Sequence, residues 1–168
     1  MQMKVAISCA AALVAAAALA ADAPQDGQIA LPTGYAGWPV FLKDVQRADV
    51  QQVRELYVNP IGARTQRGEP FPIGTVFVME NHKAVAASDG AASAGPIAKI
   101  FVMQKVDAMP VGVGEGLQNG LWVYGAFGAD GKPTGDTYQA CRGCHLPLAQ
   151  KDFVQRYDEY FEKRAPSP

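Results

Sequence analysis

The sequence predicts an α+β domain built mainly from an antiparallel β-sheet with a few helices. Glycine and proline are frequent and scattered, with 17 and 12 copies in 168 residues, which argues against a bundle of long helices. Four apolar and aromatic runs have the length of strands, and helix signals gather at the C-terminal end. Strands followed by helices in this order are typical of the α+β class.

Residues 1–20 have the organisation of a secretory signal peptide. Met1 to Lys4 carries one positive charge, Val5 to Leu19 is an almost unbroken apolar run, and Ala18-Leu19-Ala20 places small residues at alternate positions. The apolar run is shorter than the roughly 20 residues that cross a bilayer. We therefore expect export to the periplasm and a single mature domain over residues 21–168.

Charge and composition exclude two classes of partner. The formal net charge is −1 for the whole chain and becomes about −2 when Lys4 leaves with the signal peptide. A near-neutral chain has no basic footprint for nucleic acid. No second apolar run reaches membrane length, so we expect no membrane span in the mature form.

The strands are expected in the middle of the chain. Thr75–Glu80 alternates clearly, with Thr75, Phe77 and Met79 on one face. Three further runs have strand length: Gln52–Val58, Ile97–Gln104 and Leu121–Phe127. Ala84–Pro96 is rich in Ala, Ser and Gly and is predicted to be a flexible connection.

Two helices are expected near the C-terminus. Asp136 is a candidate N-cap with Gln139 three residues on, and this helix should end before Pro147. A second helix is predicted from an apolar stripe at i, i+4, i+7 and i+8, formed by Phe153, Tyr157, Tyr160 and Phe161.

The first of these helices carries the sequence Cys141-Arg142-Gly143-Cys144-His145. Positions i, i+3 and i+4 share one helix face, so two thiols can add to the vinyl groups of one haem while the imidazole reaches its iron. This spacing is typical of c-type haem attachment. We therefore predict one covalently attached haem c, with Cys141 and Cys144 binding the cofactor and His145 binding the iron, on a haem-attachment helix near the C-terminus.

Other readings of the motif are weaker. A zinc site needs a fourth ligand, and the only other histidine, His82, is distant in the sequence. A redox dithiol should follow a strand in a βαβ unit, which the pattern does not contain.

The second axial ligand of the iron is not specified by the motif. No Met or His follows His145, so an axial ligand would come from upstream: Met79, Met103, Met109 or His82. Methionines often fill gaps in a core instead. We expect a five-coordinate iron with an open distal side.

Several blocks, in their order, resemble the cytochrome P-460 family, which includes the cytochromes c′-β. The blocks are Gly34-Tyr35-x-x-Trp38, Arg54-x-x-Tyr57-Val58-Asn59-Pro60, Phe71-Pro72-x-Gly74-Thr75-Val76-x-Val78-x-Glu80, and Trp122-x-Tyr124 before the late haem motif. The resemblance implies a mostly antiparallel β fold, a homodimer, and a five-coordinate haem lying against the sheet.

One departure from the family pattern bears on activity. Family members that oxidise hydroxylamine carry a lysine joined to the haem edge, and the resemblance aligns Met79 with that lysine. A thioether has no amine for this cross-link. The resemblance therefore favours the c′-β branch, whose members bind nitric oxide at a hydrophobic distal face, with Met79 beside the cofactor.

The sequence thus predicts a periplasmic c-type cytochrome that binds nitric oxide or a similar nitrogen-oxide ligand. Phe41, Phe71 and Phe77 are candidates to cap the iron, and Arg54 either pairs with a haem propionate or forms an exposed salt bridge. An apolar pocket without hydrogen-bond donors would stabilise dioxygen poorly. The alternatives are an enzyme that oxidises hydroxylamine, with catalytic residues unassigned, and a simple electron carrier with a redox partner protein.

Overall fold

The computed structural model describes residues 23–86 and 90–164, so the predicted signal peptide lies outside the described residues. Five strands form one antiparallel sheet in the order β1-β2-β3-β4-β5. Their bounds are β1 Val40–Arg47, β2 Gln52–Val58, β3 Val76–Ala86, β4 Ala92–Lys105 and β5 Trp122–Gly128. Two α-helices follow, α1 Gln139–His145 and α2 Tyr157–Lys163, and the 3-10 helices are η1 Tyr35–Gly37, η2 Ala48–Val50, η3 Gly62–Arg64 and η4 Leu146–Lys151. The predicted α+β class is confirmed.

The four predicted strands are present, a fifth strand was not predicted, and one expectation about a connection was wrong. Strand β1 was not predicted, because Lys43 and Asp44 interrupt its apolar pattern and Asp44 has a positive φ of 53°. The segment Ala84–Pro96 is not a simple connection, since Ala84–Ala86 pairs with Ala92–Ala94 and lengthens the β3–β4 hairpin.

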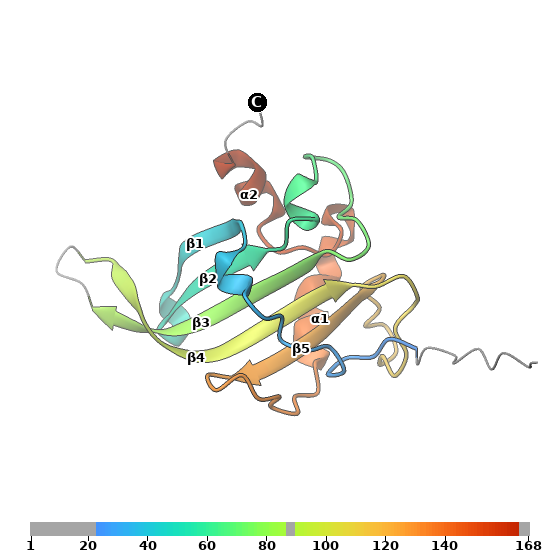
Figure 1. Cartoon of the computed structure of the whole chain (residues 1–168), viewed down its shortest axis with the longest axis horizontal. Coiled ribbons are helices and arrows are strands. Elements are labelled where there is room, and N and C mark those ends of the chain that lie inside the picture. Colours follow the sequence, from blue (N-terminus) through green and yellow to red (C-terminus); the bar gives the residue numbers. More distant parts are fainter. Residues whose placement is uncertain (1–22, 87–89, 165–168) are drawn as a thin grey trace, which may run out of the picture.

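The sheet buries both faces. One face, which we call the helix face, packs against α1, α2 and the residues between them, and its core includes Phe77, Met103 and Trp122. The opposite face, which we call the N-terminal face, buries Val78, Ile100, Val102 and Phe127 under the segment Ile29–Trp38. In Figure 1, α1 lies behind the sheet and the N-terminal segment crosses in front of it.

The cap of α1 differs from the sequence expectation. The helix ends at His145, before Pro147, as predicted, but its N-cap is Tyr138 with a left-handed φ of 58° and no side-chain cap. Asp136 does not cap the helix because its carboxylate accepts from the Lys99 ammonium at 2.6 Å and from the Thr134 hydroxyl at 2.9 Å.

In the part of the chain that the structure describes, no helix is long and apolar enough to cross a membrane.

Candidate functional site

A hollow of about 630 Å³ lies between the helix face of the sheet and α1. Cys141, Cys144 and His145 line it from α1, and Met79 lines it from β3. The structure therefore brings together the four residues that the sequence predicted for the site, and we call this space the central hollow.

His145 is held by the chain that follows it. Its Nδ1 lies 2.6 Å from the carbonyl oxygen of Phe153. A carbonyl only accepts hydrogen bonds, so Nδ1 carries the proton and Nε2 keeps its lone pair. Burial lowers the pKa of His145, although the Phe153 carbonyl acts in the opposite direction. A neutral imidazole with an oriented ring is the form that binds a metal.

The Phe153 carbonyl reaches His145 because the backbone reverses direction there. Asp152 and Phe153 are consecutive residues with positive φ, 51° and 59°. Non-glycine residues seldom adopt this left-handed conformation, and such strain often gathers at functional sites. Nearby, the Gln155 amide donates to the Cys144 carbonyl at 2.9 Å and fixes the end of α1 against the same loop.

Arg142, between the two cysteines, anchors α1 in the interior. Its side chain is 2% exposed, and its Nε and Nη2 donate to the two carboxylate oxygens of Asp26 at 2.6 and 2.8 Å. Nη2 also donates to the Trp122 carbonyl at 3.2 Å, and the guanidinium lies 5.2 Å from the centre of the Tyr124 ring. This ion pair fixes the face of α1 that carries the cysteines.

Three rows of side chains across the sheet form the floor of the central hollow. The strand register places Phe77 beside Met103 and Met79 beside Phe101, and both of these rows are apolar. The third row is polar and joins Arg54, Asn81 and Lys99, one from each of β2, β3 and β4. The floor is therefore not purely apolar, because the alternation that exposes Met79 to the hollow also exposes Asn81.

Buried polar atoms in the hollow lack partners among the described residues. They are Nε of Arg54, Oδ1 of Asn81 and the hydroxyl of Tyr124. Such atoms cost free energy unless a bound group or water satisfies them. Burial is also the main reason why the pKa of Arg54 is lowered.

The charge of the lining suits an anionic group. Four cationic side chains line the hollow, those of Arg47, Arg54, Lys99 and Arg156. Three of them pair with the carboxylates of Asp49, Asp136 and Glu159, so among the described residues Arg54 is the lining cation without an ion pair. The volume, the two thiols, the oriented imidazole and the Arg54 guanidinium fit a haem with its propionates.

The structure separates the candidate phenylalanines and methionines into those that line the central hollow and those that do not. Phe41 and Phe77 line the hollow with ring centres 4.9 Å apart, whereas Phe71 is 1% exposed and packs behind them against Phe77 and Trp122. Met103 lines the hollow, but Met109 does not and is exposed.

His82 is excluded from the hollow by the pleat of β3. Its partner across the strands is Val53, on the N-terminal face, whereas Met79 and Asn81 point to the helix face.

Sequence reasoning missed several lining residues. Strand alternation could have predicted two of them, because Asn81 lies two residues after Met79 and Lys99 lies two residues before Phe101, so each shares the face of its neighbour. No local sequence pattern indicates Arg47 or Arg156 as lining residues, because β1 was not predicted and the position of Arg156 depends on tertiary contacts. The same holds for Asp26, the partner of Arg142.

A comparison with models of protein families identifies the family of the chain. The family model described as Cytochrome P460 matches residues 32–156, which is most of the chain. A search of curated proteins found no match. The matched range contains all five strands, α1 and the three residues of the predicted haem motif.

Proposed function

Since the chain belongs to the cytochrome P460 family and is therefore a c-type haem protein, we propose that the central hollow holds one haem c and that the protein binds nitric oxide there. In this proposal Cys141 and Cys144 form the thioether bonds, and His145 is the axial ligand. The observation that carries it is the meeting of these three side chains with Met79 in one hollow.

The proximal side is prepared by the chain itself. The Phe153 carbonyl holds the Nδ1 proton of His145, so the lone pair of Nε2 is available to iron without a change of tautomer. The Asp26–Arg142 pair holds the helix that carries all three attachment residues. Together these contacts orient one imidazole toward a group attached at the two thiols.

The apolar rows of the floor support nitric oxide as the ligand. A bound haem supplies an iron that, when ferrous, takes up nitric oxide without help from a hydrogen-bond donor. The Phe41 and Phe77 rings, with Met79, line the hollow and offer no hydrogen-bond donor to a bound ligand. Distal polarity and steric access decide between gases, and the polar row of Arg54, Asn81 and Lys99 lies at one end of the apolar rows.

An electron carrier is the second candidate, and one observation favours it. Met79 and Met103 both line the hollow, so a thioether is available as a second axial ligand. Iron held by Met and His is the electron-transfer arrangement. Hydroxylamine oxidation has weaker support, because Met79 stands where the family resemblance expects a lysine and the Lys99 amine is paired with Asp136.

The absorption spectrum separates these functions. The protein is expressed with a haem c maturation system, and spectra are recorded in the oxidised state, after dithionite reduction, and after addition of nitric oxide. We expect a five-coordinate high-spin ferrous spectrum and a new band with nitric oxide. A low-spin spectrum that becomes high-spin in Met79→Leu or Met103→Leu would establish the carrier instead. A strongly red-shifted reduced Soret band would indicate a cross-linked haem and favour the enzyme.

Attachment has its own control. Cys141→Ser with Cys144→Ser should release haem from the denatured protein, while the Met79→Leu variant should retain it. Haem that stays bound to the doubly substituted chain after denaturation would refute covalent attachment through these thiols.

The proposal places the mature protein in the periplasm as a homodimer. The signal pattern of residues 1–20 supports export, and the family resemblance supports the dimer. Cell fractionation and light scattering of the purified protein test the two statements separately.

A further inference from the structure

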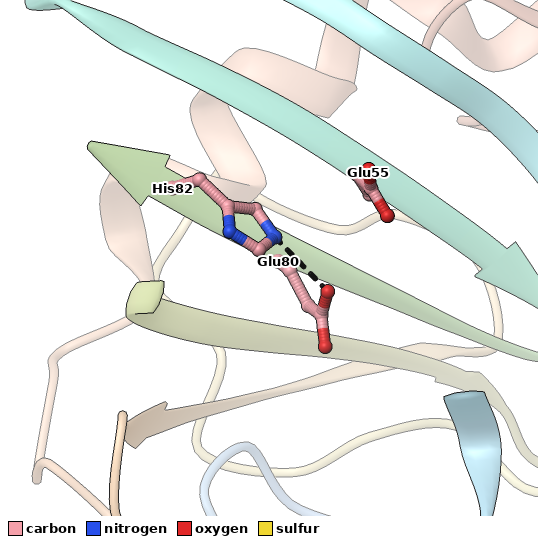
Figure 2. Close-up of side chains that lie close together, drawn as sticks. All are labelled: Glu55, Glu80 and His82. Carbon is pink, nitrogen blue, oxygen red and sulfur yellow. Dashed lines mark hydrogen bonds and ion pairs between the residues drawn. The ribbon is translucent and has the colours of Figure 1, made fainter. Parts of the chain in front are cut away.

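A second cluster of ligating side chains lies on the N-terminal face, on the other side of the sheet from the central hollow. Glu55 comes from β2, and Glu80 and His82 come from β3 (Figure 2). One carboxylate oxygen from each glutamate and one imidazole nitrogen all lie within 4.8 Å of one another. None of these residues lines the central hollow, so the cluster is independent of the proposed haem site.

The tautomer of His82 is fixed from outside the cluster. Its Nδ1 lies 2.7 Å from the carbonyl oxygen of Gly95 on β4, and since a carbonyl only accepts, the proton of the neutral ring is on Nδ1. His82 is 9% exposed. Its Nε2 lone pair therefore points into the cluster, 3.0 Å from Oε2 of Glu80, which is also an acceptor. Two acceptors at this distance require a cation or a proton between them.

The outer oxygens of both carboxylates are already satisfied. The Tyr35 hydroxyl donates to Oε1 of Glu80 at 2.7 Å, and the Tyr57 hydroxyl donates to Oε2 of Glu55 at 2.9 Å. The other oxygen of Glu55, Oε1, forms a loose ion pair with the exposed Lys43, whose Nζ lies 4.0 Å away.

We propose that Glu55, Glu80 and His82 bind a divalent transition-metal cation of the zinc type. Imidazole with carboxylate oxygen suits zinc better than magnesium or calcium, which prefer oxygen alone. A backbone carbonyl on the far nitrogen of the histidine and hydroxyls on the far oxygens of the carboxylates are the usual outer contacts of such a site. Three protein ligands leave one position for water.

The electrostatics of the cluster favour this occupant. Two carboxylates that are largely buried repel each other, and a divalent cation neutralises both while satisfying Nε2. The Glu80–His82 pair is already close, whereas Glu55 must move inward, because zinc ligands at about 2.0–2.2 Å cannot be 4.8 Å apart. The Glu55 side chain is 16% exposed and comes from the neighbouring strand, so a side-chain rotation supplies the movement. The metal would then join β2 to β3 directly behind the Leu56–Met79 pair.

Zinc titration of the haem-loaded protein tests the site. Haem occupies His145 and both cysteines, which removes the competing zinc ligands. After treatment with a chelator, isothermal titration calorimetry with zinc chloride should give one equivalent bound. Glu55→Gln keeps the size and the tyrosine contact but removes the charge, and it should abolish this binding. Tyr57→Phe removes only the outer hydroxyl and should weaken binding roughly 10–100-fold.

Glu115→Gln is the matched control, because Glu115 is exposed in the loop between β4 and β5, and it should bind zinc like the parent. Circular dichroism checks that each variant is folded. Absence of zinc uptake by the folded parent protein would overturn the proposal and leave a shared proton between Glu80 and His82. Equal zinc binding by the parent and by Glu55→Gln would overturn it as well.

Discussion

Replacing Asp26 with asparagine should destabilise the whole domain, because it leaves the Arg142 guanidinium buried without its counter-ion. The Arg142 side chain is 2% exposed and that of Asp26 is 15% exposed, and two short hydrogen bonds join them. Removing one partner of a buried ion pair costs roughly 3–5 kcal/mol. The lower end applies here, since an asparagine oxygen still accepts one bond and the Trp122 carbonyl accepts another.

We therefore expect Asp26→Asn to lower the free energy of unfolding by about 3 kcal/mol. For a domain of this length, such a loss corresponds to a Tm decrease of roughly 6–12 °C. Urea denaturation of the haem-loaded protein, followed by circular dichroism, measures the change. Because the same pair orients α1, the fraction of purified chains that carry haem should also fall.

The matched control is Glu162→Gln, which breaks the exposed Arg67–Glu162 pair at 3.4 Å. Exposed pairs contribute at most about 1 kcal/mol, so this variant should unfold almost like the parent. Asp26→Leu combined with Arg142→Met should recover much of the loss, because a buried pair replaced by apolar side chains leaves no unpaired charge. If Asp26→Asn behaved like Glu162→Gln, the pair would have no role in holding α1.

Three further outcomes are expected. The hydrogen bond and charge of Lys99 lower the pKa of Asp136, so the pair contributes stability above the ordinary carboxyl pKa of about 3.9 and loses it as pH falls through the lower folded value. Asp136→Asn should lower the free energy of unfolding by less than about 1 kcal/mol at pH 7, and its acid-unfolding curve should merge with that of the parent once the pH is below the lowered pKa of Asp136. Persistence of the difference at lower pH would assign it to something other than the ion pair. Gly62→Ala should lower the free energy of unfolding, measured by urea denaturation, by about 1–3 kcal/mol, because its Cβ would lie 2.5 Å from Cγ2 of the buried Thr75. An unchanged urea midpoint would mean that the surrounding side chains relax around the added methyl group. Gln51→Gly should stabilise the protein by roughly 0.5–1 kcal/mol, because Gln51 is exposed with φ 51° and glycine adopts this conformation without strain; a lower Tm would contradict this.

A strand could be predicted where the alternation of apolar residues within its own segment indicates it. Gln52–Val58 was predicted and is β2 with the same bounds. The end of the β3–β4 hairpin could not be predicted, because its Ala, Ser and Gly residues have low strand propensity and form strands by pairing with each other. Gly95 illustrates this: a Cβ there would lie 2.6 Å from Cγ2 of Val85 and 2.7 Å from the Lys83 carbonyl oxygen, so close strand approach requires glycine.

The features of the candidate site also fall into those that a local sequence pattern predicts and those that depend on tertiary contacts. Cys141, Cys144 and His145 were predicted from spacing along one helix turn, and Met79 from the family resemblance, which aligns it with a lysine at the haem edge. The Phe153 carbonyl was not predicted, since its direction depends on two left-handed residues that have no sequence signature of their own. Asp26 was not predicted as the partner of Arg142, because only the folded sheet brings these residues together.

The ion pair between Asp26 and Arg142 also sets an order of events during biosynthesis. The two residues are 116 positions apart, so the ribosome releases Asp26 long before Arg142 exists. All five strands lie between them and can form a hairpin meander from neighbouring contacts, whereas the closing contact must wait for the last quarter of the chain. Long-range closure of this kind is a slow step in folding. The segment that carries both cysteines therefore reaches its native position only when the two distant parts of the domain have come together.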